Sequence, residues 1–380
     1  MADAVVVAGL WVRPLAESAC QAGWRVMALD LFGDADTRRA SARWMRIGDP
    51  ASFAIAPALL GDALQRAARE PGVTGWIAGS GFEAWPDALA LHVPGLPLLG
   101  MAAAAVRRVR DPASFFATLD RLRLEHPEVS LRAPGDPEGW LVKSGAGAGG
   151  WHIRHARDAG VPAGPSIYWQ RFQAGEAMSA LFLADGARAR LVALNRLLVR
   201  PLGALPFVYH GAIGPIRDGV LTRRLQQMLA VLVPAFGLRG LASLDFIARD
   251  GRVSLLEVNP RPSATMVLHA QAWPGGLLRA HVRAVQGELP DAPASHAAGV
   301  RGCLTLFADR ACSVDAALAA ELATSPFCHD LPAPGSTFGA GEPVCSVSAE
   351  AAGTQAVLGE LAVRAERVRE RLTSCEELAA

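Results

Sequence analysis

Apolar runs alternate with amphipathic stretches over the first hundred residues. Residues 5–10 (VVVAGL), 24–30 (WRVMALD) and 73–80 (VTGWIAGS) have the pattern of buried strands, and residues 14–22 have that of a helix. Strands that alternate with helices form parallel sheets covered by helices. The pattern therefore predicts an α/β domain over residues 1–100. Residues 8–13 (AGLWVR) lack G-x-G-x-x-G, which argues against a nicotinamide cofactor despite Gly9 and Asp30.

The pattern changes from about Met101. One long helix is predicted over residues 101–124, followed by short strands and glycine loops. A second helix is predicted from Asp218 to about Phe236, before two strands that flank an Arg-Asp-Gly turn. We therefore expect an α+β domain over residues 101–290.

A further change occurs near Pro290. Residues 291–299 (DAPASHAAG) have the composition of a linker, and residues 332–347 (PAPGSTFGAGEPVCSV) are rich in turn formers. Short apolar runs and a closing helix complete the chain. These features predict a small, β-rich C-terminal domain over residues 291–380.

The composition of the chain argues against several classes of binding partner. With 37 Lys and Arg against 36 Asp and Glu, the net charge of +1 gives no basic field for nucleic acid or anionic lipid. The opening AVVVAGLWV is too short to span a bilayer, and its flanking charges are in the wrong order for a secretory signal. Six cysteines without a C-x-x-C pair fit a reduced cytoplasmic protein. We expect small-molecule partners, and the sequence leaves the oligomeric state open, a homodimer included.

Two residue types are nearly absent. Lys143 is the only lysine, and Asn195 and Asn259 are the only asparagines. Arginine cannot replace a compact ammonium, and aspartate cannot replace a neutral amide. These three residues are therefore candidates for positions where the chemistry requires them.

A glycine loop follows the single lysine. Residues 145–150 (GAGAGG) match G-x-G-x-x-G, but a strand-like WHIRHA comes next where a dinucleotide fingerprint opens a helix. A Walker loop is also excluded, because there the lysine follows the glycines. Two antiparallel strands joined by a glycine flap over phosphates fit better, with Lys143 as a point charge. A plain flexible hairpin is the alternative, and His152 and His155 fit surface histidines better than metal ligands.

Polar residues follow this loop in an apolar setting. Gln170, Gln173 and Glu176 lie in SIYWQRFQAGEAMSALFLADG, which has the pattern of two strands joined through Gly175. Such side chains suit an adenine edge and a ribose hydroxyl beside a phosphate flap. Exposed polar residues in a connector are the alternative.

An acidic hairpin is predicted in ASLDFIARDGRVSLLEVNPRP. A two-residue turn at Asp250-Gly251 would leave Asp245 and Glu257 on opposite faces, because a slip of one residue flips every side chain. A three-residue loop, Arg249 to Gly251, would instead pair Asp245 with Leu255. We therefore expect the longer loop, which places Asp245, Glu257 and Asn259 on one face.

That face has the ligands of a hard cation. Two carboxylates and an amide oxygen, without thiolate or histidine, suit Mg²⁺ held partly by nucleotide phosphates. The carboxylates would repel each other in a core without the cation. Arg261, just past the strand, could reach the charge that develops in phosphoryl or acyl transfer. A solvent-facing acidic strand is the weaker alternative.

In this order, Lys143 before the flap, QRFQAGE and LDFIARDGRVSLLEVNPRP resemble the ATP-grasp superfamily. The resemblance covers roughly residues 1–345 and implies an ATP-grasp fold of mixed α/β and α+β class, with a pre-ATP-grasp domain first and a flap subdomain at about 135–172. It implies ATP with Mg²⁺, or Mn²⁺ in its place. Asp245, Glu257 and Asn259 would hold the metal, and Arg261 and Lys143 would be catalytic. The implied nucleotide ligands are Lys143, Gly147, Gly149, Gly150, Gln170, Phe172, Gln173 and Glu176.

Local features resemble particular groups of enzymes within this superfamily. GFEAWP at 81–86 resembles a turn of carboxyaminoimidazole ribonucleotide synthetases, and the overall layout resembles ligases of C1-carrier cofactor synthesis. A ligase that activates a small carboxylate as an acyl phosphate and joins it to an amine is the expected activity. A bicarbonate-dependent carboxylase and an inactive nucleotide-binding protein are the alternatives.

Two features of the implied site stay open. Asp111-Pro112 stands where the family often has a second phosphate-binding lysine, so that Arg110 or Arg107 would replace it. Candidates for the substrate pocket, for which core or surface roles are equally open, are Arg13, Glu83, Tyr209, His210, Gly211 and His269.

Overall fold

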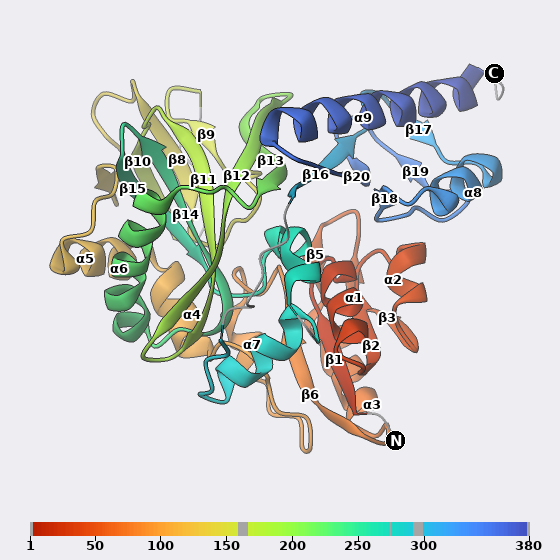
Figure 1. Cartoon of the computed structure of the whole chain (residues 1–380), viewed down its shortest axis with the longest axis horizontal. Helices are drawn as coiled ribbons and strands as arrows, with labels where there is room; N and C mark the ends of the chain where they lie inside the picture. Colours follow the sequence, from red (N-terminus) through yellow and green to blue (C-terminus); the bar gives the residue numbers. More distant parts are fainter. Residues whose placement is uncertain (1–2, 159–165, 274, 292–298, 378–380) are drawn as a thin grey trace.

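The computed structural model describes residues 3–158, 166–273, 275–291 and 299–377. Figure 1 shows an N-terminal layer of helices and strands, a large sheet flanked by α6, and a C-terminal part crossed by the long helix α9. The expected linker at 291–299 and the flap subdomain at 135–172 fall partly on residues 292–298 and 159–165, outside the described residues. The predicted divisions at 100 and 290 stay predictions.

The N-terminal part is a parallel sheet in the order β3-β2-β1-β6. Strand β1 is apolar along its length and β2 is apolar between its terminal residues Arg25 and Asp30, as a sheet covered on both faces requires. The predicted α/β layout is confirmed. Its elements are β1 (Ala4–Ala8), α1 (Arg13–Gln21), β2 (Arg25–Asp30), α2 (Ala35–Arg39), β3 (Arg43–Arg46), β4 (Gly48–Asp49), β5 (Ala54–Ile55), α3 (Pro57–Ala68), β6 (Val73–Ala78) and η1 (Pro86–Ala90).

The long helix predicted over residues 101–124 is wrong, because two helices occupy this segment. They are α4 (Ala103–Arg110) and α5 (Pro112–Leu122). Asp111 has an extended backbone, as a residue before proline prefers, and its side chain accepts a hydrogen bond from the Ser114 backbone N–H at 2.8 Å. The break leaves Arg110 at the last position of α4.

A small antiparallel sheet follows in the order β7-β10-β8-β9. Its strands are β7 (Val129–Ser130), β8 (Trp140–Ser144), β9 (Arg154–His155) and β10 (Ile167–Arg171). Strands β8 and β9 pair antiparallel, so the glycine loop of residues 145–153 joins two strands as predicted. Lys143 is on β8, opposite Tyr168 of β10.

An eight-stranded sheet forms the centre of the molecule, in the order β15-β14-β11-β12-β13-β16-β20-β18. The hairpin strands β14 (Arg239–Arg249) and β15 (Arg252–Asn259) form one edge, and the predicted helix at 218–236 is α6 (Gly219–Phe236), capped by Asp218. The other elements of this part are β11 (Glu176–Asp185), β12 (Ala189–Leu202), β13 (Leu205–Gly214), η2 (Ala264–Ala272) and α7 (Leu277–Val285).

The C-terminal residues extend this sheet. Strand β16 pairs with β13, so the β-rich part continues the central sheet through main-chain hydrogen bonds. Helix α9 packs its apolar side, including Val357 and Leu361, in one core cluster with Val347 of β20. The elements are β16 (Val300–Phe307), β17 (Cys312–Ser313), α8 (Ala316–Thr324), β18 (Cys328–His329), β19 (Thr337–Phe338), β20 (Pro343–Ala351) and α9 (Thr354–Glu377). No helix of the described residues is long and apolar enough to cross a membrane.

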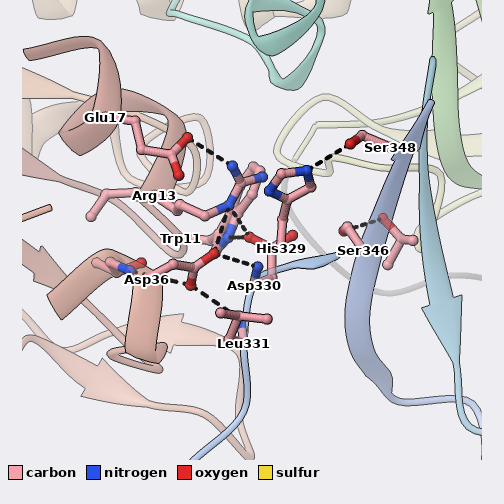
Figure 2. Close-up of polar contacts among 12 residues, drawn as sticks. Trp11, Arg13, Glu17, Asp36, His329, Asp330, Leu331, Ser346 and Ser348 are labelled. Carbon is pink, nitrogen blue, oxygen red and sulfur yellow. Dashed lines mark hydrogen bonds and ion pairs between the residues drawn. The ribbon is translucent and has the colours of Figure 1, made fainter. Parts of the chain in front are cut away.

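A buried charge cluster joins the N-terminal helices α1 and α2 to a loop in the C-terminal part of the chain (Figure 2). The Arg13 guanidinium donates to Asp330 at 2.6 Å and lies 3.6 Å from Asp36. Asp36 in turn accepts from the backbone N–H groups of Asp330 and Leu331, at 2.8 and 3.1 Å. Burial favours the neutral arginine, but the carboxylates outweigh it and raise the pKa of Arg13. These residues fasten the loop after β18 to α1 and α2.

Candidate active site

A cavity of about 240 Å³ lies between the small sheet and the central sheet. The small sheet supplies Lys143 and Gln170, and the central sheet supplies Asp245 and Glu257. Most of the remaining wall is apolar, as in sites that hold a planar ligand and fix it by few polar groups. Lining residues used below are Gly149, Gly150, His152, Phe172, Gln173, Ser179, Phe207, Tyr209, Asn259, Arg261, Ser263 and Thr265.

The acidic face forms by a register that differs from the predicted one. Asp250 and Gly251 make a two-residue turn, both with positive φ, and Arg249 pairs with Arg252. The predicted three-residue loop is therefore wrong. A β-bulge at Leu256 shifts the register between Phe246 and Asp245, so that Asp245 still lies opposite Glu257.

Asp245, Glu257 and Asn259 are thereby brought together, as the sequence led us to expect. The Asn259 amide donates to Asp245 at 2.9 Å. Burial and the charge of Glu257 raise the pKa of Asp245, against hydrogen bonds from Ser179 and Asn259 and the charge of Arg261. Burial acts in the same direction on Glu257, but Arg110, His152 and Lys143 outweigh it and lower the pKa of that carboxyl. Repulsion between the carboxylates is the property that a bound cation would relieve.

Lys143 projects from the opposite wall. It is buried and donates to the Gln170 side chain at 2.6 Å. Burial lowers the pKa of Lys143 to about 8, although Glu257 and Asp245 favour its charged form. An anion in the cavity would raise that pKa again, because opposite charge favours the protonated amine. The lysine is thus placed to respond to a phosphate.

Arg110 lies where it can replace the absent second lysine. Its guanidinium donates to Glu257 at 2.9 Å and to the carbonyls of Gly145 and Gly147 at 2.9 and 2.6 Å. It therefore ties the base of the glycine loop to the acidic face. Arg107 instead forms an exposed ion pair with Asp87, away from this site.

The glycine loop lies against strand β13. The Tyr209 backbone N–H donates to the Gly149 carbonyl at 3.0 Å. A Cβ at Gly150 would come within 1.8 Å of the Phe207 carbonyl oxygen, so only glycine allows this approach. Gly147 packs in the same way on the His152 ring and does not line the cavity among the described residues.

The predicted adenosine contacts divide into two groups. Gln170, Phe172 and Gln173 line the cavity, and the Phe172 ring stacks on that of Phe207 at 5.8 Å between centroids. Glu176 is exposed, forms an ion pair with Arg196 at 2.8 Å, and is not among the described lining residues. The structure thus does not bring Glu176 to the cavity.

Arg261 stands at the inner edge of the cavity. Its Nε donates to Glu83, a buried residue of the GFEAWP turn, which also accepts from the Gly81 backbone N–H at 2.7 Å. Burial raises the pKa of Glu83, but Arg261 and Arg110 outweigh it, and the net effect is a lowered pKa. Glu83 thus fixes the direction of the arginine from the N-terminal domain.

The remaining substrate-pocket candidates are dispersed. Tyr209 lines the cavity, whereas Arg13 belongs to the buried charge cluster. His210 packs on Phe307, at 4.6 Å between ring centroids, and Gly211 approaches the Cys303 carbonyl. The His269 side chain contacts Asn195, outside the described lining.

Sequence reasoning missed several lining residues. Ser179 lies opposite Asp245 in the sheet, and His152 is half-buried beside the loop, where burial lowers its pKa to about 4. Ser263 and Thr265 follow Arg261. Ser263 and Thr265 could have been found from the sequence, because they follow the NPRP motif. The position of Ser179 depends on the register of β11 against β14, which the sequence does not reveal.

The described residues contain no group of three or more His, Cys, Asp or Glu that could hold a metal ion. The face has two carboxylates and one amide, so its geometry suits a cation whose remaining ligands come from phosphates and water. Together with a lysine and a glycine loop on the facing wall, this arrangement is typical of the class of proteins that bind a nucleotide with a divalent cation.

Comparisons with known proteins agree with this class. Residues 109–265 match the family model described as ATP-grasp domain. These residues therefore contain an ATP-grasp domain, in agreement with the resemblance seen in the sequence. A search of curated proteins finds no match.

Solved structures share the fold at low identity. Biotin carboxylase from Campylobacter jejuni has a TM-score of 0.70 at 12% identity, over 93% of this chain and 89% of its own. N5-carboxyaminoimidazole ribonucleotide synthetase from Thermus thermophilus has 0.66 at 18%, over 97% and 98%. N5-carboxyaminoimidazole synthase from Aspergillus clavatus, in complex with ADP and 5-aminoimidazole ribonucleotide, has 0.70 at 13%, over 98% and 100%. The ATP-grasp fold predicted from the sequence is thereby confirmed.

Proposed function

We propose that this protein activates a small carboxylate as an acyl phosphate at the expense of ATP and joins it to an amine, with release of ADP and phosphate. The observation that carries the proposal is the acidic face of Asp245, Glu257 and Asn259, placed opposite Lys143 and beside Arg261. An acceptor that is an amino acid or an aromatic amine, in the synthesis of a C1-carrier cofactor, is part of the proposal.

The acidic face fits Mg²⁺, with Mn²⁺ as a substitute. Asp245, Glu257 and Asn259 would hold the ion. Burial and the charge of Glu257 raise the pKa of Asp245, and the ion would remove the repulsion between the two carboxylates. Carboxylate and amide oxygens without sulfur or imidazole are the donors that such hard cations prefer. When bound, the ion neutralises negative charge on the phosphate oxygens.

The chain's own residues would divide the remaining work. Lys143, with the backbone N–H groups of the glycine loop, would hold the phosphates, and the apolar wall with Phe172 would cover the base. Arg261 carries a fixed positive charge at the end of β15, where it would stabilise the anionic group during transfer. Its ion pair with Glu83 keeps the guanidinium directed without a large loss of entropy on binding.

The direct test is product analysis with ATP, Mg²⁺ and a panel of amino acids, aromatic amines, small carboxylates and bicarbonate. Substrate-dependent formation of ADP and phosphate, with an amide product, is the expected result. Formation of AMP would refute the acyl-phosphate route. Turnover with bicarbonate alone would identify a carboxylase instead, and nucleotide binding without turnover would identify an inactive protein.

Location and assembly are further parts of the proposal. A cytoplasmic protein acting on small molecules fits the fold and the absence of a membrane-spanning helix among the described residues. A homodimer is tested by light scattering of the purified chain.

A further inference from the structure

A row of polar residues crosses the central sheet from the acidic face. Glu257 of β15 pairs with Asp245 of β14, Asp245 with Ser179 of β11, and Ser179 with Asn195 of β12. Directly paired residues share one face of a sheet. Asn195 is fully buried at the far end of this row and is one of the two asparagines of the chain.

Two contacts fix the orientation of the Asn195 amide. Its nitrogen faces the Ser179 carbonyl at 3.5 Å, and its oxygen lies 2.7 Å from His269 Nε2. A backbone carbonyl only accepts, so the amide nitrogen must be the group that faces Ser179. The oxygen then faces His269, and His269 Nε2 must carry the hydrogen.

The neighbouring strand leaves room for this amide. A Cβ at Gly214 of β13 would come within 2.2 Å of the Asn195 side-chain oxygen, far inside contact distance. An aspartate at position 195 would turn a second oxygen toward the Ser179 carbonyl and add a third carboxylate to the row. Gly214 thus leaves room for a side chain of this size, and charge and hydrogen bonding favour the neutral amide over the carboxylate of the same shape.

His269 belongs to η2, the 3₁₀ segment that follows Arg261. Ser263, just before η2, and Thr265 within it line the cavity. A 3₁₀ helix has poor hydrogen-bond geometry, so its position depends on tertiary contacts. The Asn195–His269 bond is one such contact, and Arg301 supplies another by donating to the Leu268 carbonyl and to Gln271.

We propose that Asn195 is a positioning residue: through His269 it holds the segment of residues 261–272 at a fixed distance from the metal-binding carboxylates. The catalytic part of this inference rests on the proposed function, because the segment contains Arg261 and the cavity-lining residues Ser263 and Thr265. Neither Asn195 nor His269 is among the described residues that line the cavity. Their role is to keep Arg261 and the acidic face in one geometry.

The test compares Asn195→Ala, His269→Ala, the double variant and His269→Gln in the full-length protein. Glutamine can donate from its amide where Nε2 donates, so His269→Gln is the conservative variant. We expect kcat to fall about tenfold or more in each alanine variant, with KM for ATP little changed, because a buried partner is left without its bond. The double variant should be no slower than the slower single variant, since one interaction is lost in all three. His269→Gln should stay close to wild type across the pH profile.

Hydrogen–deuterium exchange supplies a readout that needs no turnover. Backbone amides of residues 261–272 should exchange about tenfold faster in Asn195→Ala than in wild type. Exchange in α6 should change little in Asn195→Ala, and exchange of residues 261–272 should change little in His269→Gln. Unchanged exchange in this segment would overturn the proposal, and so would faster exchange with unchanged kcat. Additive losses in the double variant, or a His269→Gln variant as slow as His269→Ala, would also overturn it. If wild type forms no product with the whole panel, only the proposed reaction fails, and the exchange result still decides whether Asn195 holds the segment.

Discussion

The substitution Glu257→Gln removes one charge from the acidic face while it keeps the size of the side chain. Glu257 lies opposite Asp245 and accepts from Arg110 at 2.9 Å. Paired side chains are about 5 Å apart, so at an effective dielectric constant of about 20 the two carboxylates repel by about 3 kcal/mol. A divalent cation bound by the wild-type protein would convert this repulsion into binding energy. The variant retains half of the negative charge and loses one strong ligand.

Two effects of this substitution follow. Turnover should fall by about 10²-fold or more, because the loss of one electrostatic stabiliser typically has that effect. The stability of the nucleotide-free protein at neutral pH should be lower, because Arg110, His152 and Lys143 lower the pKa of Glu257 and the charged carboxylate therefore stabilises the folded state. Steady-state ADP release across a Mg²⁺ titration measures the first effect, and thermal unfolding without ligand measures the second.

A matched control is Glu125→Gln. Glu125 pairs with Arg224 and Arg252 on the surface of the same region, so this variant loses an equal charge away from the cavity. It should retain wild-type turnover. Near-full activity of Glu257→Gln at limiting Mg²⁺ would refute the assignment of the acidic face to a metal.

Three further variants test the site and the fold. Lys143→Ala should weaken ATP binding, measured by calorimetry, about tenfold or more, because it removes a buried charge from the phosphate wall; unchanged affinity would contradict that placement. Asp245→Asn should alter the pH dependence of unfolding. The folded pKa of Asp245, raised to about 7, exceeds its unfolded value near 4, so its contribution to wild-type stability is complete below about pH 4 and is lost as the pH rises to about 7. The unfolding temperature of ligand-free Asp245→Asn, relative to that of wild type, should therefore rise as the pH increases through this window. If the difference in unfolding temperature between the two proteins did not change with pH, the raised pKa of Asp245 would be excluded. Asp330→Ala should destabilise the protein by about 2 kcal/mol or more in denaturant unfolding, because it takes a principal partner from buried Arg13. A wild-type midpoint would show that Asp36 and Glu17 suffice.

Sequence alone predicted the acidic face correctly from a wrong register. Alternation placed Asp245 and Glu257 on one side of a hairpin only if the turn had three residues. The chain instead uses the two-residue turn at Asp250-Gly251 and recovers the face by a bulge at Leu256. A bulge leaves little trace in the hydrophobic pattern, because its position depends on how β15 packs against the rest of the molecule. Of the three residues singled out by their rarity, Lys143 and Asn259 line the cavity and Asn195 is not among the described lining residues.

Long-range contacts explain the other differences between the predictions from the sequence and the structure. Arg110 and Arg107 could not be distinguished from the sequence, since the choice depends on the break at Pro112 and on the distance from α4 to Glu257. Glu176 was predicted from its place in QRFQAGE, but it lies at the first position of β11, where Arg196 of the neighbouring strand reaches it. The pairing of Glu83 with Arg261 links residues 178 positions apart, which no local pattern reveals.

The charge cluster of Arg13, Asp36 and Asp330 connects the C-terminal part of the chain to the N-terminal part, so that the connected elements form a closed ring. From α1 the chain runs into the central sheet, passes through β13 and β16 by main-chain bonds, and returns to α1 at Asp330. A hinge between the first and last parts would have to break either strand pairing or a buried ion pair. The small sheet of β7, β8, β9 and β10 lies outside this ring, and no strand pairing joins it to the central sheet among the described residues. A movement of the small sheet would therefore leave both the strand pairing of the ring and the buried ion pair intact.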